Sequence, residues 1–490
     1  MRSSISYNKS ASARRGLVIA GLAATVLLGA CGGSTKSATT PTTAKGSTSS
    51  TTATASTSAS TAAPTTVPRT TVAPAATDKW GKKSQGATST TAPQVVVTGG
   101  LPPFKHASPL DDLIATALVD LDGYWAEVMP QLYNIPWKPI SGGYFPYTSA
   151  SNLPPCPGVK QYADVAQNAF YCPAADLVAW DDEGLIPDLD AKYGDFTLGI
   201  VMAHEIAHAV QTRINLPATL TVTKEEQADC FAGAWVASVA NGNSKNFQVK
   251  LNDLDGAVAG FLELRDEPGS SGVSKGAHGS AFDRIGSFQE GFEDGAKACA
   301  TYTDENIATR LVQIPFTNAD DQSSGGNLPF DQVLPAVDAD LNSFWSTVFL
   351  QAGMTWEPID PTERADRELA VKLYDNIGDF AAATLLGRAY ASFVQERLGE
   401  GGTPLQQSLQ ADCLTGSWAA SMFLKDRPDA ALSMSPGDLD KAVMALLVMG
   451  DSADDVQNGS ATTGSPFQRV SALRTGFMTG IAACARITQS

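Results

Sequence analysis

The stretch LGIVMAHEIAHAVQTR, residues 198–213, is an apolar run that holds two of the four histidines of the chain. It is apolar enough to form a buried helix, on which side chains four positions apart lie one above the other on one face. His204 and His208 can therefore present their imidazole nitrogens to one metal ion. Glu205 lies about 100 degrees round the helix, where it can contact a group bound to the ion without being a ligand.

A third metal ligand is expected from another segment, because a catalytic zinc site normally has three protein ligands and one water. TVTKEEQADCFAGAWVAS, residues 221–238, predicts a second helix. Thr223 and Glu226 fit a capping box at its start, which would leave Glu225 free to project toward the metal. Glu226 stays the alternative ligand, because capping is a local preference. Asp229 follows one turn after Glu225 on the same face.

An internal repeat organises the rest of the chain. Four blocks recur in the same order: one near Trp125 matches one near Trp345, GDFTLGIVMAHEIAHAVQTRI matches GDFAAATLLGRAYASFVQERL, QADCFAGAWVAS matches QADCLTGSWAAS, and HGSAFDRIGSFQEGFEDGAKAC matches TGSPFQRVSALRTGFMTGIAAC. We call residues 100–305 the first copy and residues 328–490 the second copy, with residues 306–327 as a linker. The second copy has Arg388, Ala389 and Ser392 where the first has the two histidines and the glutamate. It therefore retains the framework without the chemistry, and we expect it to be catalytically inactive.

Strand signals are confined to the first copy. NAFYC and DLVAWD, residues 168–172 and 176–181, alternate apolar and polar residues on either side of a turn at Pro173, which predicts a hairpin. The second copy lacks this region, from about Ser141 to Asp190. We therefore expect an α+β fold, with helices on a small sheet in the first copy and a mostly α-helical degenerate repeat after it.

The N-terminus predicts export. Residues 1–30 have a basic start and a short apolar run, as in a signal peptide, and LGAC at 28–31 resembles a bacterial lipobox that would make Cys31 the lipidated first residue. An ordinary signal peptide or a short anchor helix is the alternative. Residues 31–99 are rich in Ser, Thr, Pro and Ala, a composition typical of a disordered stalk. We therefore expect a bacterial cell-envelope protein, extracytoplasmic and anchored to the membrane by lipid.

Six cysteines remain, an even number in a chain expected to be exported, which predicts three disulfides. The repeat places Cys230 and Cys299 opposite Cys413 and Cys484, so we pair them within each copy. Cys156 and Cys172 are then left to each other. None of the six has the close spacing of a structural zinc knuckle.

Charge excludes one class of partner. Residues 101–490 hold 50 of the 51 acidic residues but only 24 of the 34 basic ones. Such a surface argues against binding to nucleic acid or another polyanion. The sequence does not determine the oligomeric state.

HEIAH followed by EEQADCFAG resembles the bacterial putative neutral zinc metallopeptidase family, itself similar to the gluzincins, whose E-x-x-A-D helix supplies a glutamate ligand. NAFYCPAADLVAWDD is similar to the strand region of that family, and HGSAFDRIGSFQEGFEDG to its distal H-G-S block. The resemblance covers residues 160–300 well and residues 101–140 weakly. It implies a zincin-like first copy with Zn²⁺ on His204, His208 and Glu225, and with Glu205 as general base.

Two further residues are given roles beside the ligands, Asp229 by this resemblance and His278 by the place of its H-G-S block near the cleft. Asp229 would orient a zinc-bound histidine, although Asp412 keeps the aspartate in the second copy, so that a purely structural hydrogen bond is equally open. His278 would donate a hydrogen bond to the developing oxyanion, with a surface or helix-start residue as the alternative.

The implied function is hydrolysis of peptide bonds by zinc-activated water, on a peptide or protein substrate in the cell envelope. The alternative from another class is a non-catalytic envelope binding or assembly protein on a peptidase scaffold. A third interpretation is a structural zinc site closed by a fourth ligand such as Glu226 or His278.

Overall fold

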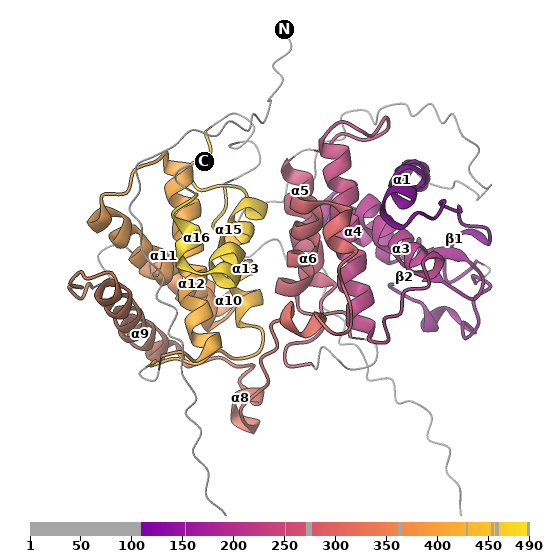
Figure 1. Cartoon of the computed structure of the whole chain (residues 1–490). Coiled ribbons are helices and arrows are strands. Elements are labelled where there is room, and N and C mark those ends of the chain that lie inside the picture. Colours follow the sequence, from indigo (N-terminus) through magenta and orange to yellow (C-terminus); the bar gives the residue numbers. More distant parts are fainter. Residues whose placement is uncertain are drawn as a thin grey trace, which may run out of the picture. The chain divides into compact units, whose positions relative to one another are not determined.

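The computed structural model describes residues 109–487, apart from 152, 250, 271–276, 361–364, 428–429, 452–454 and 456–459. These described residues all belong to one compact unit of the chain and form a mixed α+β structure of many helices and one small sheet (Figure 1). The expected signal peptide, Cys31 and the stalk lie outside them. None of the described helices is both long and apolar enough to cross a membrane.

Most elements of the first copy are helices. In chain order, the α-helices and strands of the first copy are α1 (Pro109–Tyr133), β1 (Gly143–Tyr147), β2 (Ala169–Cys172), β3 (Leu177–Asp181), α2 (Leu185–Tyr193), α3 (Phe196–Arg213), α4 (Thr221–Ala240), α5 (Leu251–Glu263), α6 (Ala281–Asp294) and α7 (Ala296–Cys299). After the short α8 (Ala319–Ser323) come α9 (Phe330–Gln351), α10 (Arg367–Asn376), α11 (Asp379–Leu398), α12 (Pro404–Leu424), α13 (Asp438–Val448), α15 (Pro466–Thr479) and α16 (Ile481–Cys484). The described part of the second copy holds no strand.

The sheet has the strand order β1-β3-β2. β2 pairs with β3 antiparallel, so the predicted hairpin is confirmed, and β1 pairs with β3 parallel. β3 lies in the centre and is buried along its whole length. β2 is left at one edge, where it contacts α3. The motif helix therefore lies beside an edge strand.

Matched sequence blocks form helices in the same order in both copies, and these helices pack in corresponding pairs. α4 packs on α6 in the first copy as α12 packs on α15 in the second. Glycine permits backbone contact in both pairs. A Cβ at Gly233 would lie 1.9 Å from the carbonyl oxygen of Phe288, and one at Gly416 would lie 2.0 Å from that of Leu473. Any larger residue there would push the two helices apart.

All three predicted disulfides are present. Cys230 on α4 bonds to Cys299 on α7, and Cys413 on α12 bonds to Cys484 on α16, with the same Cα separation of 5.5 Å. Cys156 bonds to Cys172 at the end of β2. Each copy thus has one disulfide that ties its central helix to its last short helix.

The start of α4 differs from the prediction. The helix begins at Thr221, and Glu226 does not fold back to make a capping box. The carboxylate of Asp304 instead accepts hydrogen bonds from the N–H of Thr219 at 2.6 Å and of Leu220 at 3.3 Å. The capping-box prediction was wrong because the chain after Cys299 returns to the start of α4 and supplies a better acceptor from a distant segment.

Replacing Asp304 by Ala should lower the free energy of unfolding by about 1 kcal/mol, the usual net contribution of an intramolecular hydrogen bond. Partial burial would raise the pKa of Asp304, but hydrogen bonds from Thr219, Thr223 and Leu220 outweigh it and hold this pKa at about 2. Since this is below the unfolded value, the stabilisation is full above pH ~4 and is lost as the pH falls toward 2. Urea unfolding of parent and variant at pH 6 and pH 3 measures this; an equal difference at both pH values would contradict it.

Candidate metal centre

Two helices bring the three expected ligands together. α3 carries His204 and His208, and α4, which packs on α3, carries Glu225. The two Nε2 atoms lie 3.1 Å apart, and Oε2 of Glu225 lies 3.2 Å from Nε2 of His204 and 3.6 Å from that of His208. In the part of the chain that the structure describes, no other group of His, Cys, Asp or Glu side chains converges in this way.

This arrangement fits a zinc ion. Ligands about 2.0–2.1 Å from a tetrahedral zinc lie about 3.3–3.4 Å from one another, close to the three separations observed. Two imidazoles and one carboxylate are a donor set of catalytic zinc sites, which keep a fourth position for water. The described side chains thus fit a site with three protein ligands.

A buried ion pair orients His204. Nδ1 of His204 lies 2.7 Å from Oδ1 of Asp229, and Asp229 in turn accepts two hydrogen bonds from Arg284 on α6, at 2.7 and 2.9 Å. Burial alone would raise the pKa of Asp229, but Arg284 and His204 outweigh it and lower this pKa. An ionised carboxylate only accepts, so Nδ1 of His204 carries a proton and Nε2 faces the site.

Gln211 orients His208 in a corresponding way. Its Nε2 donates to the carbonyl oxygen of Lys224 at 2.7 Å, which fixes the amide because a carbonyl only accepts. Its Oε1 therefore faces Nδ1 of His208, 3.0 Å away, and accepts the proton of that nitrogen. Sequence analysis did not assign Gln211 this role; the available signal was its place three residues after His208, one turn along α3.

The environment of the histidines favours a positive charge. Burial would lower the pKa of His204, but Asp229 and Glu225 outweigh it and raise this pKa to about 10. Burial likewise opposes ionisation of Glu225, yet the neighbouring His208 and His204 hold its pKa well below the ordinary value. Surrounding carboxylates thus stabilise a cation at the point where the ligand atoms converge.

Glu205 lies on the same helix but contacts the sheet. It is buried, and its Oε2 accepts a hydrogen bond from the backbone N–H of Tyr171 on β2 at 2.8 Å. Burial raises the pKa of Glu205, and this effect outweighs the opposing attraction of His204 and His208. A carboxylate with a raised pKa, beside the metal ligands and held by an edge strand, is suited to accepting and returning a proton.

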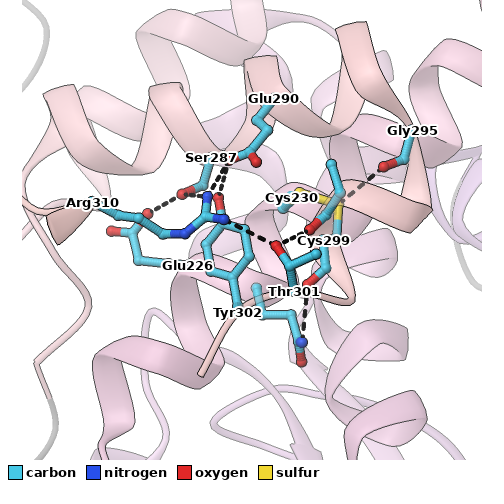
Figure 2. Close-up of a disulfide and its surroundings, with 11 residues drawn as sticks. Glu226, Cys230, Ser287, Glu290, Gly295, Cys299, Thr301, Tyr302 and Arg310 are labelled. Carbon is cyan, nitrogen blue, oxygen red and sulfur yellow. Dashed lines mark hydrogen bonds and ion pairs between the residues drawn. A yellow bond between two sulfur atoms is a disulfide. The ribbon is translucent and has the colours of Figure 1, made fainter. Parts of the chain in front are cut away.

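Glu226 points away from this site, toward Ser287 on α6. Figure 2 shows it with Ser287 and Tyr302 beside Cys230 and Cys299. Ser287 donates to Oε2 of Glu226, and Tyr302 contacts Ser287 at 3.0 Å. Burial and then the charge of Asp283 raise the pKa of Glu226 well above the ordinary value. Of the two glutamates, Glu225 is the one that joins the histidines.

The ring of His278 contacts Asp266 and none of the three ligands among the described residues. Its side chain is about half exposed, and Nδ1 lies 3.4 Å from Oδ1 of Asp266. It precedes Ser280, whose side chain caps α6. No contact among the described residues joins its ring to the three ligands, and its predicted role toward an oxyanion stays a prediction.

The second copy replaces the site by an arginine. Arg388 stands where the first copy has His204; its Nε lies 3.0 Å from Oδ1 of Asp412, and its Nη2 donates to Ser408 at 2.8 Å. Asp412 also pairs with Arg469, as Asp229 pairs with Arg284. The Asp–Arg pair is therefore structural in both copies, and in the first copy it also contacts a candidate ligand.

A cavity of about 310 Å³ lies beside the motif helix. Its lining includes Tyr171 on β2 and Thr212 and Arg213 at the end of α3. The guanidinium of Arg213 already has partners within the protein, because it pairs with Asp176 at 3.1 Å and lies over the ring of Trp137. The cavity therefore joins the edge strand to the turn of α3 that follows the histidines.

Two bacterial proteins are similar to part of this chain. Uncharacterized protein YpfJ of Escherichia coli (strain K12) is 32% identical over 160 residues, which cover 27% of this chain and 53% of that protein. Uncharacterized protein Rv2575 of Mycobacterium tuberculosis (strain ATCC 25618 / H37Rv) is 25% identical over 194 residues, covering 34% of this chain and 66% of that protein. The chain thus spans about half the length of the first of these relatives. No solved structure matches it.

Residues 154–302 match the family described as putative neutral zinc metallopeptidase. This range contains the hairpin, α3 and α4 with the three converging side chains, and both cysteines of the first-copy disulfide. The part of the chain that carries the candidate metal centre is therefore the part that matches the putative neutral zinc metallopeptidase family.

Proposed function

We propose that the chain is a zinc-dependent peptidase whose active site lies in a zincin-like first copy. The observation that carries this proposal is the convergence of His204, His208 and Glu225, with Glu205 one residue from a ligand. The family match of residues 154–302 supports it. The second copy has none of these four side chains, and we propose that it is an inactive repeat.

His204, His208 and Glu225 would hold the ion. Zinc bound there supplies acidity to a water and polarises a carbonyl group. Glu205 accepts the proton of the attacking water and then donates it to the leaving amine, for which its raised pKa suits it. The N–H of Tyr171 holds the carboxylate of Glu205 in place during both transfers.

An extended peptide is the proposed substrate. β2 is an edge strand beside α3, and strand edges bind extended peptides by main-chain hydrogen bonds. The N–H of Tyr171 is held by Glu205, so a peptide would pair with the other outward-facing main-chain groups of β2. The cavity at Tyr171 and Thr212 could receive one side chain of such a peptide. We further propose that the substrate lies in the bacterial cell envelope, with the protein extracytoplasmic and tethered through a lipid on Cys31.

A non-catalytic binding or assembly protein is the second candidate. The loss of the three ligands and of Glu205 from the second copy favours it, because the helix packing there persists without the groups that would do the chemistry. A closed structural zinc site is less well supported, since among the described residues Glu226 and His278 are engaged elsewhere and no fourth ligand converges.

Metal content tests the centre. The purified chain should hold about one zinc, and a His204→Ala, His208→Ala double variant should hold none, because one carboxylate cannot retain the ion. Elemental analysis after gel filtration measures this. Equal zinc in both folded chains would place the metal elsewhere and remove the basis of the peptidase proposal.

Glu205→Gln should keep the zinc and the fold but lower peptide cleavage by at least about 100-fold, since the amide cannot take the proton of water. Hydrolysis of a peptide library by parent and variant, followed by mass spectrometry, measures it. Cleavage at the parent rate by the zinc-loaded variant would contradict the role of Glu205.

Gln211→Ala should weaken zinc binding about 10- to 100-fold, because His208 loses the acceptor that fixes its ring. Gln395→Ala is the matched control: Gln395 makes the same bond to a backbone carbonyl in the second copy, but Ser392 stands where the histidine would be. Competition with a chromogenic chelator measures both affinities. Similar zinc affinity for the two variants would show that Gln211 acts only through the packing of α3 on α4.

A further inference from the structure

The two copies meet through helices that correspond to each other in sequence. α5 and α6 of the first copy contact α13 and α15 of the second. LDGAV in α5 aligns with LDKAV in α13, and AFDRIGSF in α6 aligns with PFQRVSAL in α15. Each copy therefore contributes the same pair of helices to the interface.

Hydrogen bonds across this interface are reciprocal. The carboxylate of Asp440 on α13 accepts from the N–H of Phe282 in the first turn of α6, at 3.0 Å. Asp255 on α5, the counterpart of Asp440, accepts from the N–H of Phe467 in the first turn of α15, at 2.9 Å. Both N–H groups are helix-terminal donors without an intrahelical partner. Each copy thus caps a helix of the other.

The aromatic contacts across the interface are reciprocal as well. Phe282 packs edge-on against Phe477, and Phe467, the counterpart of Phe282, packs edge-on against Phe292, the counterpart of Phe477. Both ring pairs have centroids 5.2 Å apart. Reciprocal pairs of this kind define an isologous interface, in which residue i contacts j while j contacts i across a two-fold axis.

A third reciprocal pair is unequal. Arg474 donates to the carbonyl oxygen of Phe282, and Gln289, its counterpart, donates to that of Phe467 at 3.2 Å. The longer arginine needs space that the first copy provides, because a Cβ at Gly286 would lie 1.7 Å from Nη2 of Arg474.

Ser471 is the counterpart of Gly286 in the second copy, and it bonds to Glu293 at 2.8 Å. Two second copies meeting in this way would bring Arg474 against Ser471 instead of against a glycine. The difference between the copies therefore favours pairing of a first with a second copy over pairing of two second copies.

One of these contacts is linked to the metal centre through α6. Phe282, which Asp440 caps, lies two residues before Arg284 on α6. Arg284 holds Asp229, and Asp229 holds His204. The reciprocal contact at Asp255 ends instead on α15, in the copy without ligands.

We propose that the second copy acts as a built-in partner subunit: it binds the first copy through a two-fold, homodimer-type interface, and by capping α6 it positions Arg284, Asp229 and His204 for the metal. The part of this proposal that concerns zinc rests on the proposed function. The interface part does not.

Asp440→Ala and Asp255→Ala in the whole chain separate the two effects. Each removes one member of the same reciprocal pair, and both should lower the melting temperature. Asp440→Ala also removes the ion pair of Asp440 with Arg265 of the first copy, at 3.2 Å, and Asp440→Asn separates this loss from the loss of the acceptor for Phe282. Only Asp440→Ala frees the start of α6, so it should weaken zinc binding at least about threefold, whereas Asp255→Ala should change it less than about twofold. Asp440→Asn, which keeps an acceptor for Phe282, should restore parent affinity. Parent zinc affinity in Asp440→Ala, or equal losses in both alanine variants, would overturn the positioning role.

A cut between the copies tests the interface without reference to metal or to Asp440. No disulfide joins the copies among the described residues, and Ser324 and Gly325, in the turn after α8, are exposed. A protease recognition sequence inserted there should allow cleavage into two fragments that still elute together in gel filtration at micromolar concentration. Fragments that separate in native buffer, each at its own size, would overturn the proposed partner role of the second copy.

Discussion

The ion pair between Asp229 and Arg284 is the interaction on which the candidate site depends. Both side chains are almost fully buried, and the pair joins α4 to α6 at the point where His204 approaches from α3. Removing one partner of such a pair usually costs about 3–5 kcal/mol, because the other charge is left buried and uncompensated. Three helices are therefore held in one arrangement by a single carboxylate, which also fixes the proton on His204.

Asp412 and Arg469 repeat this pair in the second copy, where no histidine needs orienting. There Arg388 provides the additional positive charge at the aspartate. The helix packing common to both copies thus requires the Asp–Arg pair, while the metal centre is an addition to it. This order of dependence explains how the second copy can lack the candidate ligands and keep the same disulfide and the same close contact between helices.

Buried acidic side chains have opposite charge states on the two sides of α4. On the α3 side, carboxylates and imidazoles balance each other's charge and leave their ligand atoms facing one point. On the α6 side, Glu226 is buried beside Ser287 with its pKa raised, so that burial there favours a neutral acid. Adjacent residues on one helix therefore have different roles because they face different neighbours.

The sequence by itself determined the elements and the ligand types. Helical spacing put His204 and His208 on one face, alternation predicted the hairpin, and the aligned cysteines predicted the disulfides, since each of these follows from local periodicity or from comparing the copies. The tertiary structure decided which glutamate joins the histidines, that Asp304 binds the two residues before α4, that Gln211 orients His208, and that α6 is capped from the second copy. These contacts join residues that are distant in the chain or depend on how an amide or carboxylate is turned. No local pattern encodes them, because the distance between two side chains is fixed only once the helices that carry them have packed.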